Sequence, residues 1–238
     1  MGESVRLSKR LIELIHCSRS EADQYIQGGW VLVDGNVVEQ PQFKVDEQCV
    51  ELHPDAVLTS VEPTTILLHL PIGFDLEDPV APLKLIVPDS RSENDGSGIR
   101  LLGRHFSRLM QTMPLETGAT GLLVFTQDHR VVKRLVDDAA KNEQEYHVEV
   151  EGTIADNGLD KLNRNMKLNG WPLSIAKVSW QNEHCLRFAL KNVRAGQLEF
   201  MCQSVGLKVV GLKRIRIGRV PMSLQPGQWR YLPQGVLF

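Results

Sequence analysis

The sequence contains few cysteines and no long hydrophobic run. Its 4 cysteines lie far apart in 238 residues, and no two of them form a Cys-x-x-Cys pair. This spacing argues against a zinc site and against a disulfide framework, so we expect buried, reduced thiols. No apolar stretch approaches the roughly 18 residues of a membrane span. The N-terminus also lacks the apolar region of a secretory signal. We therefore expect a cytoplasmic protein that does not bind a membrane.

The net charge of −2 conceals an uneven distribution of charged residues. Residues 1–55 carry five basic groups against ten acidic ones, whereas residues 194–230 carry seven basic groups against Glu199 alone. A basic stretch of this kind is the usual electrostatic signature of a phosphate-binding surface. Charge therefore predicts nucleic-acid binding for the C-terminal part of the chain, but not for the N-terminal part.

The N-terminal region has the pattern of a small domain, which we predict at residues 1–55 with a linker at 56–64. Apolar residues recur at helical spacing over residues 6–15. Ser18 followed by Glu21 matches a capping box, which predicts a second helix from Arg19. Two β-rich runs around Asp34-Gly35 predict a hairpin.

Residues 65–238 form the larger predicted domain. Its strand patterns outnumber its helical patterns, and no β-α-β alternation is present. We therefore predict an α+β fold with a mostly antiparallel sheet. Residues 130–142 predict a helix, and residues 208–218 predict paired strands. The acidic residues 75–99, rich in Pro, Ser and Gly, predict a mobile loop.

Four basic side chains make the first domain a candidate for phosphate contact. Arg6, Lys9 and Arg10 lie on the polar side of the first predicted helix. Arg19 begins the second helix, where free backbone N–H groups also favour phosphate. The alternative interpretation is a pair of solvated helix faces without a ligand.

A second set of basic residues lies near the C-terminus. Side chains alternate along a strand, so Arg214 and Arg216 are expected on one face and Lys213 on the other. Two neighbouring arginines on one face can grip phosphates. Arg194 is a further candidate RNA contact. An exposed polar strand face is again the alternative.

The first domain resembles the S-four RNA-binding domain of a ribosomal protein, tyrosyl-tRNA synthetases and some pseudouridine synthases. That pattern reads roughly RLDKxLxxxxxxSRxEAxxxIxxGxVxVNG. The chain departs from it at Gln27 and Trp30, where basic residues are common in the family. The matching residues are Arg6, Leu7, Lys9, Leu11, Ser18, Arg19, Glu21, Ala22, Ile26, Gly29, Val31, Val33 and Gly35.

The remainder resembles ribosomal RNA pseudouridine synthases that carry an S-four domain. LKRIRIG at 212–218, with the residues up to 232, fits their closing pattern LKRIRIGxxxLxxLxxGxWRxL. GLLVFTQD at 121–128 is similar to GLLLLTND, and EYHVEVEG at 145–152 is similar to EYLVEVEG. The resemblance covers nearly the whole chain, with a gap over residues 75–105.

The resemblance implies that the partner is structured RNA, usually ribosomal. Family members isomerise uridine to pseudouridine without a metal or other cofactor, and the target base must leave its stack. The resemblance therefore implies no metal and no cofactor for this chain. We expect a monomer.

The resemblance also implies a catalytic Asp, an Arg paired with it and a Tyr against the base. Here Glu116 occupies the Asp position and Tyr146 keeps the Tyr position, whereas Glu199 occupies the Arg position. Other charged family positions are replaced as well, at Leu70, Pro114 and Gln144.

These departures predict an RNA-binding protein whose catalysis is reduced or lost. Glu116 is one methylene longer than Asp, and a misplacement of about 1 Å can lower a rate by on the order of 100-fold. A nearby Glu199 would raise one carboxyl pKa. The first alternative is an active, divergent synthase that uses Glu116. The second is a protein-interaction module, suggested by the acidic first domain. Individually, Glu116 can be a loop carboxylate without chemistry and Tyr146 a core aromatic residue.

Overall fold

The computed structural model describes residues 4–74, 78 and 80–238. The chain divides into two compact units: Met1–Pro63 with Arg100–Ser107, and Thr64–Ile99 with Arg108–Phe238. The chain passes from one unit to the other three times. Arg100–Ser107 therefore belongs to the first unit, although its neighbours in the sequence on both sides belong to the second.

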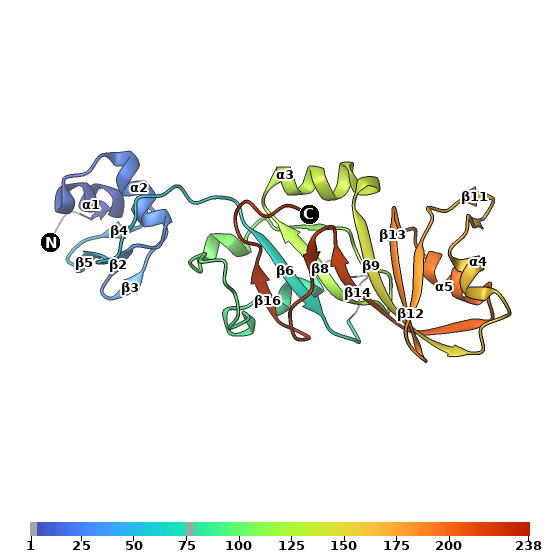
Figure 1. Cartoon of the computed structure of the whole chain (residues 1–238). Coiled ribbons are helices and arrows are strands. Elements are labelled where there is room, and N and C mark those ends of the chain that lie inside the picture. Colours follow the sequence, from blue (N-terminus) through green and yellow to red (C-terminus); the bar gives the residue numbers. More distant parts are fainter. Residues whose placement is uncertain (1–3, 75–77, 79) are drawn as a thin grey trace. The chain divides into compact units, whose positions relative to one another are not determined.

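Two helices lie in the first unit (Figure 1). Helix α1 (Leu7–Ile15) ends at His16, whose φ of 55° lies in the left-handed region. Helix α2 (Arg19–Gln27) begins with the predicted capping box. The Ser18 hydroxyl accepts from the Glu21 N–H (3.2 Å), and the Glu21 carboxylate accepts from the Ser18 N–H (2.7 Å). The apolar faces of the two helices meet in one cluster, which includes Leu7, Leu11, Ala22 and Ile26.

Short strands complete the first unit. The predicted hairpin is confirmed: β2 (Val31–Val33) pairs with β3 (Asn36–Val37), and both Asp34 and Gly35 have positive φ. The other strands are β5 (Val50–Leu52), which pairs with β2, and β1 (Val5–Arg6), which pairs with β4 (Lys44–Val45). The segment Arg100–Ser107 adds a short 3₁₀ helix, η3 (Gly103–Phe106).

A 9-stranded sheet dominates the second unit among the described residues (Figure 1). Only the β14–β8 pair is parallel there, so the predicted α+β fold with a mostly antiparallel sheet is confirmed. The main strand order is β12-β13-β9-β14-β8-β6-β16, with β15 on β14 and β7 on β8. The strands are β6 (Thr65–Leu70), β7 (Met110–Thr112), β8 (Thr120–Thr126), β9 (Glu143–Gly152), β12 (Lys177–Asn182), β13 (Cys185–Lys191), β14 (Leu207–Ile217), β15 (Val220–Pro221) and β16 (Trp229–Tyr231).

The helix predicted at residues 130–142 consists of three consecutive pieces. These are α3 (His129–Val132), a π-helical turn η4 (Lys133–Asp137) and a 3₁₀ turn η5 (Ala139–Lys141). Val131 and Leu135 pack this segment onto Leu122 and Val124 of β8. Elsewhere lie α4 (Gly158–Leu162), α5 (Gln197–Gln203), the hairpin of β10 (Lys167–Leu168) with β11 (Trp171–Pro172), η1 (Ala81–Leu85) and η2 (Pro88–Ser90).

Strand β14 differs from the prediction in two ways. Residues 207–217 form one long strand instead of paired strands. Opposite β9, the register shifts so that Arg214 pairs with Tyr146 and Arg216 pairs with the adjacent Glu145. Adjacent residues of β9 point to opposite faces, and cross-strand partners share a face. The bulge at Ile215 therefore places Arg214 and Arg216 on opposite faces, and the prediction of one shared face is wrong.

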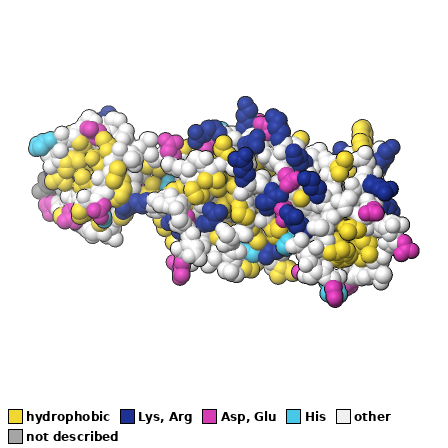
Figure 2. All heavy atoms as spheres, viewed as in Figure 1, with side chains coloured by type: hydrophobic (Ala, Val, Ile, Leu, Met, Phe, Trp, Pro, Cys, Tyr) yellow, Lys and Arg dark blue, Asp and Glu magenta, His cyan; other side chains and the backbone are white. Residues whose placement is uncertain are grey.

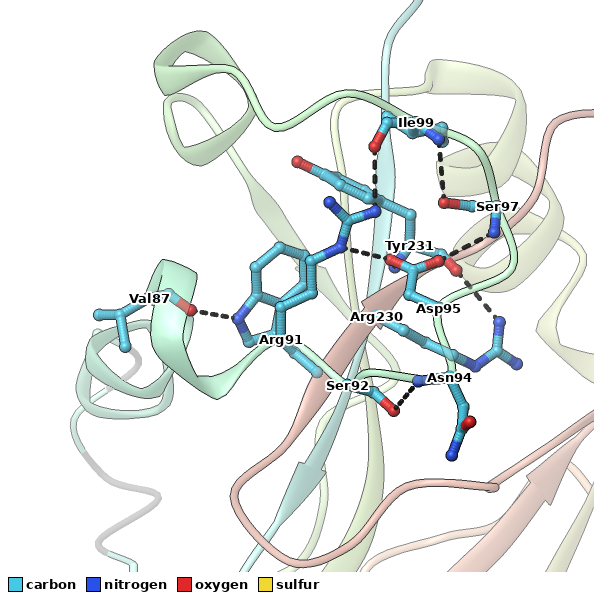
Figure 3. Close-up of polar contacts among 10 residues, drawn as sticks. Val87, Arg91, Ser92, Asn94, Asp95, Ser97, Ile99, Arg230 and Tyr231 are labelled. Atoms are coloured by element: carbon cyan, nitrogen blue, oxygen red, sulfur yellow. Dashed lines mark hydrogen bonds and ion pairs between the residues drawn. The ribbon is translucent and has the colours of Figure 1, made fainter.

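Residues 87–99 are held by specific contacts, which contradicts the mobile loop predicted at 75–99 for this part. The Asp95 carboxylate accepts from Arg91 Nε (2.8 Å), the Ser97 N–H (3.0 Å) and the Tyr231 N–H (3.1 Å) (Figure 3). Arg91 also packs against the ring of Tyr231, with its Cζ 4.9 Å from the ring centroid. Composition did not reveal these partners because Tyr231 lies on β16, far away in the sequence. Residues 75–77 and 79 of the predicted loop lie outside the described residues.

Within the described part of the chain, every helix is too short or too polar to cross a bilayer.

Candidate functional site

A pocket with a volume of about 550 Å³ lies in the second unit. The loop between β7 and β8, the helical segment 135–139, strands β9 and β14 and the loop before α5 supply its walls. The structure thus brings the predicted residues Glu116 and Tyr146 to one cavity. The lining residues are Gln111, Met113, Pro114, Leu115, Glu116, Leu135, Val136, Ala139, Gln144, Tyr146, Asn192, Val193, Ala195 and Arg214.

Glu116 is the acidic group of this pocket. Its carboxylate accepts a hydrogen bond from the Gly196 N–H (3.1 Å). Among the described residues, no lysine or arginine forms an ion pair with it. Burial raises the pKa of Glu116, the Gly196 N–H partly offsets this, and the charge of Glu199 adds to the rise. The approach of Glu116 and Glu199 agrees with the sequence argument, although burial is the larger cause.

Tyr146 is almost fully buried, with 5% of its surface exposed. Its hydroxyl donates to Gln144 Oε1 (2.8 Å), which also accepts from Arg214 Nη1 (3.1 Å). Burial raises the pKa of Tyr146, and the charge of Arg214 partly counteracts this. The pocket wall therefore contains a chain of hydrogen bonds that fixes the tyrosine hydroxyl.

Arg214 lies inside the protein rather than on an exposed strand face. It is 1% exposed, and it donates to the carbonyls of Leu122 (2.7 and 2.9 Å) and Met113 (2.6 Å). A Cβ at Gly121 would collide with the Arg214 carbonyl oxygen, so only glycine fits beside this strand. Arg214 thus connects β8, the loop after β7 and Gln144 around the pocket.

Arg216 is committed to carboxylates on the other face of the sheet. Its guanidinium donates to Glu143 (2.6 Å) and Glu145 (2.8 Å), and Arg187 also pairs with Glu145. The hydrogen bond from Arg187 is the main cause of the lowered pKa of Glu145, and Arg216 lowers it further against the effect of burial. These ion pairs compete with any phosphate for Arg216.

The other predicted RNA contacts are distributed over the two units. Arg194 is exposed, and its chain neighbours Val193 and Ala195 line the pocket. Lys213 is half-buried on β14. In the first unit Arg6, Lys9 and Arg19 are exposed, whereas Arg10 donates to the Asp46 carbonyl (2.9 Å).

Sequence reasoning overlooked the basic residues of the segment 129–141. Leu135, Val136 and Ala139 of this segment line the pocket, and Leu135 and Val136 belong to its π-helical turn. π-Helical turns occur frequently at functional sites. Dark blue side chains gather over α3 in Figure 2. The amphipathic spacing of HRVVKRLVDDAAK could have revealed this face, whose basic members are Arg130, Lys133, Arg134 and Lys141.

A metal site is not apparent in the described part of the chain, where no three His, Cys, Asp or Glu side chains form a ligand group.

Known proteins share both parts of this chain. A family model described as "S4 domain" matches residues 5–48. An RNA pseudouridine synthase of Aquifex aeolicus, named as uncharacterized, is 30% identical over 97% of this chain and 93% of its own length. The chain belongs to the RNA pseudouridine synthase family.

Two further relatives have names that describe their activity more closely. The ribosomal small subunit pseudouridine synthase A of Vibrio cholerae is 29% identical over 97% of this chain and 96% of its own length. The dual-specificity RNA pseudouridine synthase RluF of Escherichia coli is 27% identical over 96% of this chain and 76% of its own length.

The fold agrees with this membership. A crystal structure of a pseudouridylate synthase covers 97% of both chains with a TM-score of 0.59 at 23% identity. Sequence similarity thus identifies the family, and the structural similarity supports the fold. The S4 match covers α1, α2 and strands β1 to β4 of the first unit, and the pocket lies in the second unit.

Proposed function

We propose that this chain binds structured ribosomal RNA and that its capacity to isomerise uridine is reduced or lost. One observation carries the proposal: the pocket carboxylate Glu116 has no basic partner among the described residues. The family resemblance supports it, since that resemblance assigns Glu199 to the position of the family's arginine. Burial and Glu199 both favour the neutral acid, so the anionic form needed for catalysis is disfavoured.

The names of the relatives support RNA, and specifically ribosomal RNA, as the partner. The retained cavity is large enough for one extruded base, and its walls combine apolar side chains with Tyr146 and Gln144. We extend the proposal to a monomer that meets this RNA in the cytoplasm.

A second candidate is an active synthase that uses Glu116. It is favoured by the presence of a carboxylate and Tyr146 in the same pocket. In that case the Gly196 N–H would orient the carboxylate.

Tritium release from ribosomal RNA labelled at carbon 5 of uridine distinguishes the two candidates. We expect no release by the wild type above a control without protein. Release by the wild type that disappears in Glu116→Gln would overturn the proposal and support the active enzyme. Pseudouridine mapping in cells that lack the protein, with the wild type or Glu116→Gln restored, extends the test to natural substrates.

A gain-of-function variant tests the cause of the deficit. The pair Glu116→Asp and Glu199→Arg restores the family carboxylate and its partner. If the missing pair alone limits the reaction, this variant should release tritium, whereas Glu199→Gln should not.

A further inference from the structure

The segment Arg100–Ser107 forms part of the S4-containing unit, although it comes from the middle of the synthase sequence. Glu39 holds its backbone: one carboxylate oxygen accepts from the Gly103 N–H (2.8 Å) and the other from the Arg104 N–H (3.4 Å). Leu102 is 4% exposed, and a Cβ at Gly29 would approach its Cδ2 to 2.7 Å. The segment is therefore closely packed onto the turn that follows α2.

Two arginines of this segment lie over the end of α2. The Arg100 guanidinium lies over the Trp30 ring, with its Cζ 4.2 Å from the ring centroid. Arg104 is exposed, and its Nη1 donates to Gln27 Oε1 (3.2 Å). The neutral residues Gln27 and Trp30 thus each contact an arginine that lies more than 60 positions away in the sequence.

These arginines add positive charge at the C-terminal end of α2. Residues 1–55 are acidic overall, and Arg19 is the only basic residue of α2. Gln27 lies eight residues after Arg19, about 12 Å along the helix. Arg104 thus places a second positive charge at the opposite end of α2 from Arg19, and Arg100 places a third on the adjacent indole.

We propose that Arg100 and Arg104, held on the S4-containing unit by Glu39, form an RNA-binding surface together with Arg19. Guanidinium groups bind phosphates in a forked geometry, and their planar surface can also stack on an unstacked base. The surface therefore suits a bent or looped RNA strand, whose phosphates reach Arg104 and Arg19 while a base covers Arg100. This inference rests on the proposed RNA-binding function and adds to it a segment outside residues 5–48, which the S4 domain model matches.

The test is a salt titration of binding between the full chain and purified ribosomal RNA, measured by filter retention. The double variant Arg100→Gln, Arg104→Gln should lower the slope of log Kobs against log salt by about 0.7 to 0.9, since Arg104 supplies one phosphate contact, and loss of the Arg100 stack should lower Kobs at every salt concentration without changing the slope further. The matched control is Arg164→Gln, an exposed arginine of the second unit, which should leave the slope unchanged. Arg100→Lys with Arg104→Lys should retain most of the slope.

A slope of the double variant equal to that of Arg164→Gln would overturn the inference and leave general RNA binding intact. In that case the arginines only tie the segment to the domain, and the melting temperature alone should fall. No salt-dependent binding by the wild type would overturn both this inference and the proposed function.

Glu39→Ala provides an independent variant that keeps both arginines. It removes a negative charge, so charge alone predicts tighter binding of RNA. Loss of the hydrogen bonds from Gly103 and Arg104 should instead release the segment and weaken binding. Tighter or unchanged binding by Glu39→Ala would contradict a role for the placed segment.

Discussion

Two carboxylates of the second unit, Asp95 and Glu116, have opposite surroundings. The side chain of Asp95 is 3% exposed, yet its pKa is lowered: burial alone would raise it, but hydrogen bonds from Ser97, Tyr231 and Arg91 outweigh burial. Glu116 accepts one N–H, and burial raises its pKa. Burial by itself therefore does not decide the direction in which a carboxyl pKa shifts; the hydrogen-bond donors and charges around the carboxylate also contribute.

The difference separates a structural role from a ligand-facing one. Asp95 is saturated with donors from its own loop and from β16, so it has little capacity left for a ligand (Figure 3). Glu116 accepts a hydrogen bond from the Gly196 N–H alone among the described residues, and it lines a cavity. Substitutions at the two sites should therefore change stability in opposite directions.

The largest effect is expected for Asp95→Asn. An asparagine removes the charge that binds Arg91 and offers one acceptor oxygen instead of two. Hydrogen bonds to charged groups contribute about 1.5–3 kcal/mol, so we expect the free energy of unfolding to fall by about 3 kcal/mol. Urea unfolding followed by tryptophan fluorescence measures this, because Trp229 lies beside Arg91. The control is the exposed Asp89→Asn; equal midpoints for the two variants would contradict the assigned role of Asp95.

An intermediate loss of stability is expected at Glu145. This carboxylate is buried and ion-paired, but one of its partners, Arg216, also pairs with Glu143. Glu145→Gln should lower stability at neutral pH by about 2 kcal/mol. Arg216 keeps Glu143, which limits the loss. The pKa of Glu145 is lowered in the folded state. Its contribution is therefore complete above the ordinary glutamate pKa and is lost as the pH falls through the folded value.

The corresponding measurement is urea unfolding across this acidic range. The difference in the free energy of unfolding between the wild type and Glu145→Gln should disappear as the pH falls. The variant Glu183→Gln, at an exposed position, should have the stability of the wild type at every pH. A gap that does not depend on pH would show that packing, rather than charge, is responsible.

A smaller loss is expected for Tyr146→Phe. The substitution removes one hydrogen bond to Gln144, worth about 1 kcal/mol, while Arg214 continues to satisfy the same oxygen. Tyr25→Phe in the first unit is the control. A loss as large as that of Asp95→Asn would mean that the pocket wall is primarily structural, and the contrast between the two sites would disappear.

The smallest effect, of opposite sign, is expected for Glu116→Gln. The raised pKa means that the folded state binds more protons than the unfolded state above the ordinary glutamate pKa, so stability falls as the pH rises through that window. The variant avoids this loss and should gain about 0.5 kcal/mol or less at neutral pH, with no gain in acid. Thermal unfolding of the wild type and the variant, at neutral pH and at a pH below the ordinary glutamate pKa, measures this difference in stability. A destabilised variant would show that Glu116 belongs with Asp95.

Local sequence patterns determined much of the fold. The capping box at Ser18 and Glu21, the hairpin at Asp34-Gly35 and the strand periods of β8 and β9 depend on neighbours within a few residues, so the chain specifies them locally. The family resemblance brought Glu116 and Tyr146 together, because motif order reflects a shared sheet topology.

Only the tertiary structure decided where several charged residues point. Arg214 and Arg216 separate because β14 bulges to match β9, and the anchoring of residues 87–99 depends on β16. Likewise, Arg100 and Arg104 belong to the S4-containing unit through Glu39, Trp30 and Gln27. Each of these partners lies far away in the sequence. The spacing of side chains along the chain and the composition of a segment do not reveal contacts between residues so far apart in the sequence. Such contacts are set by how different helices, strands and loops pack against one another.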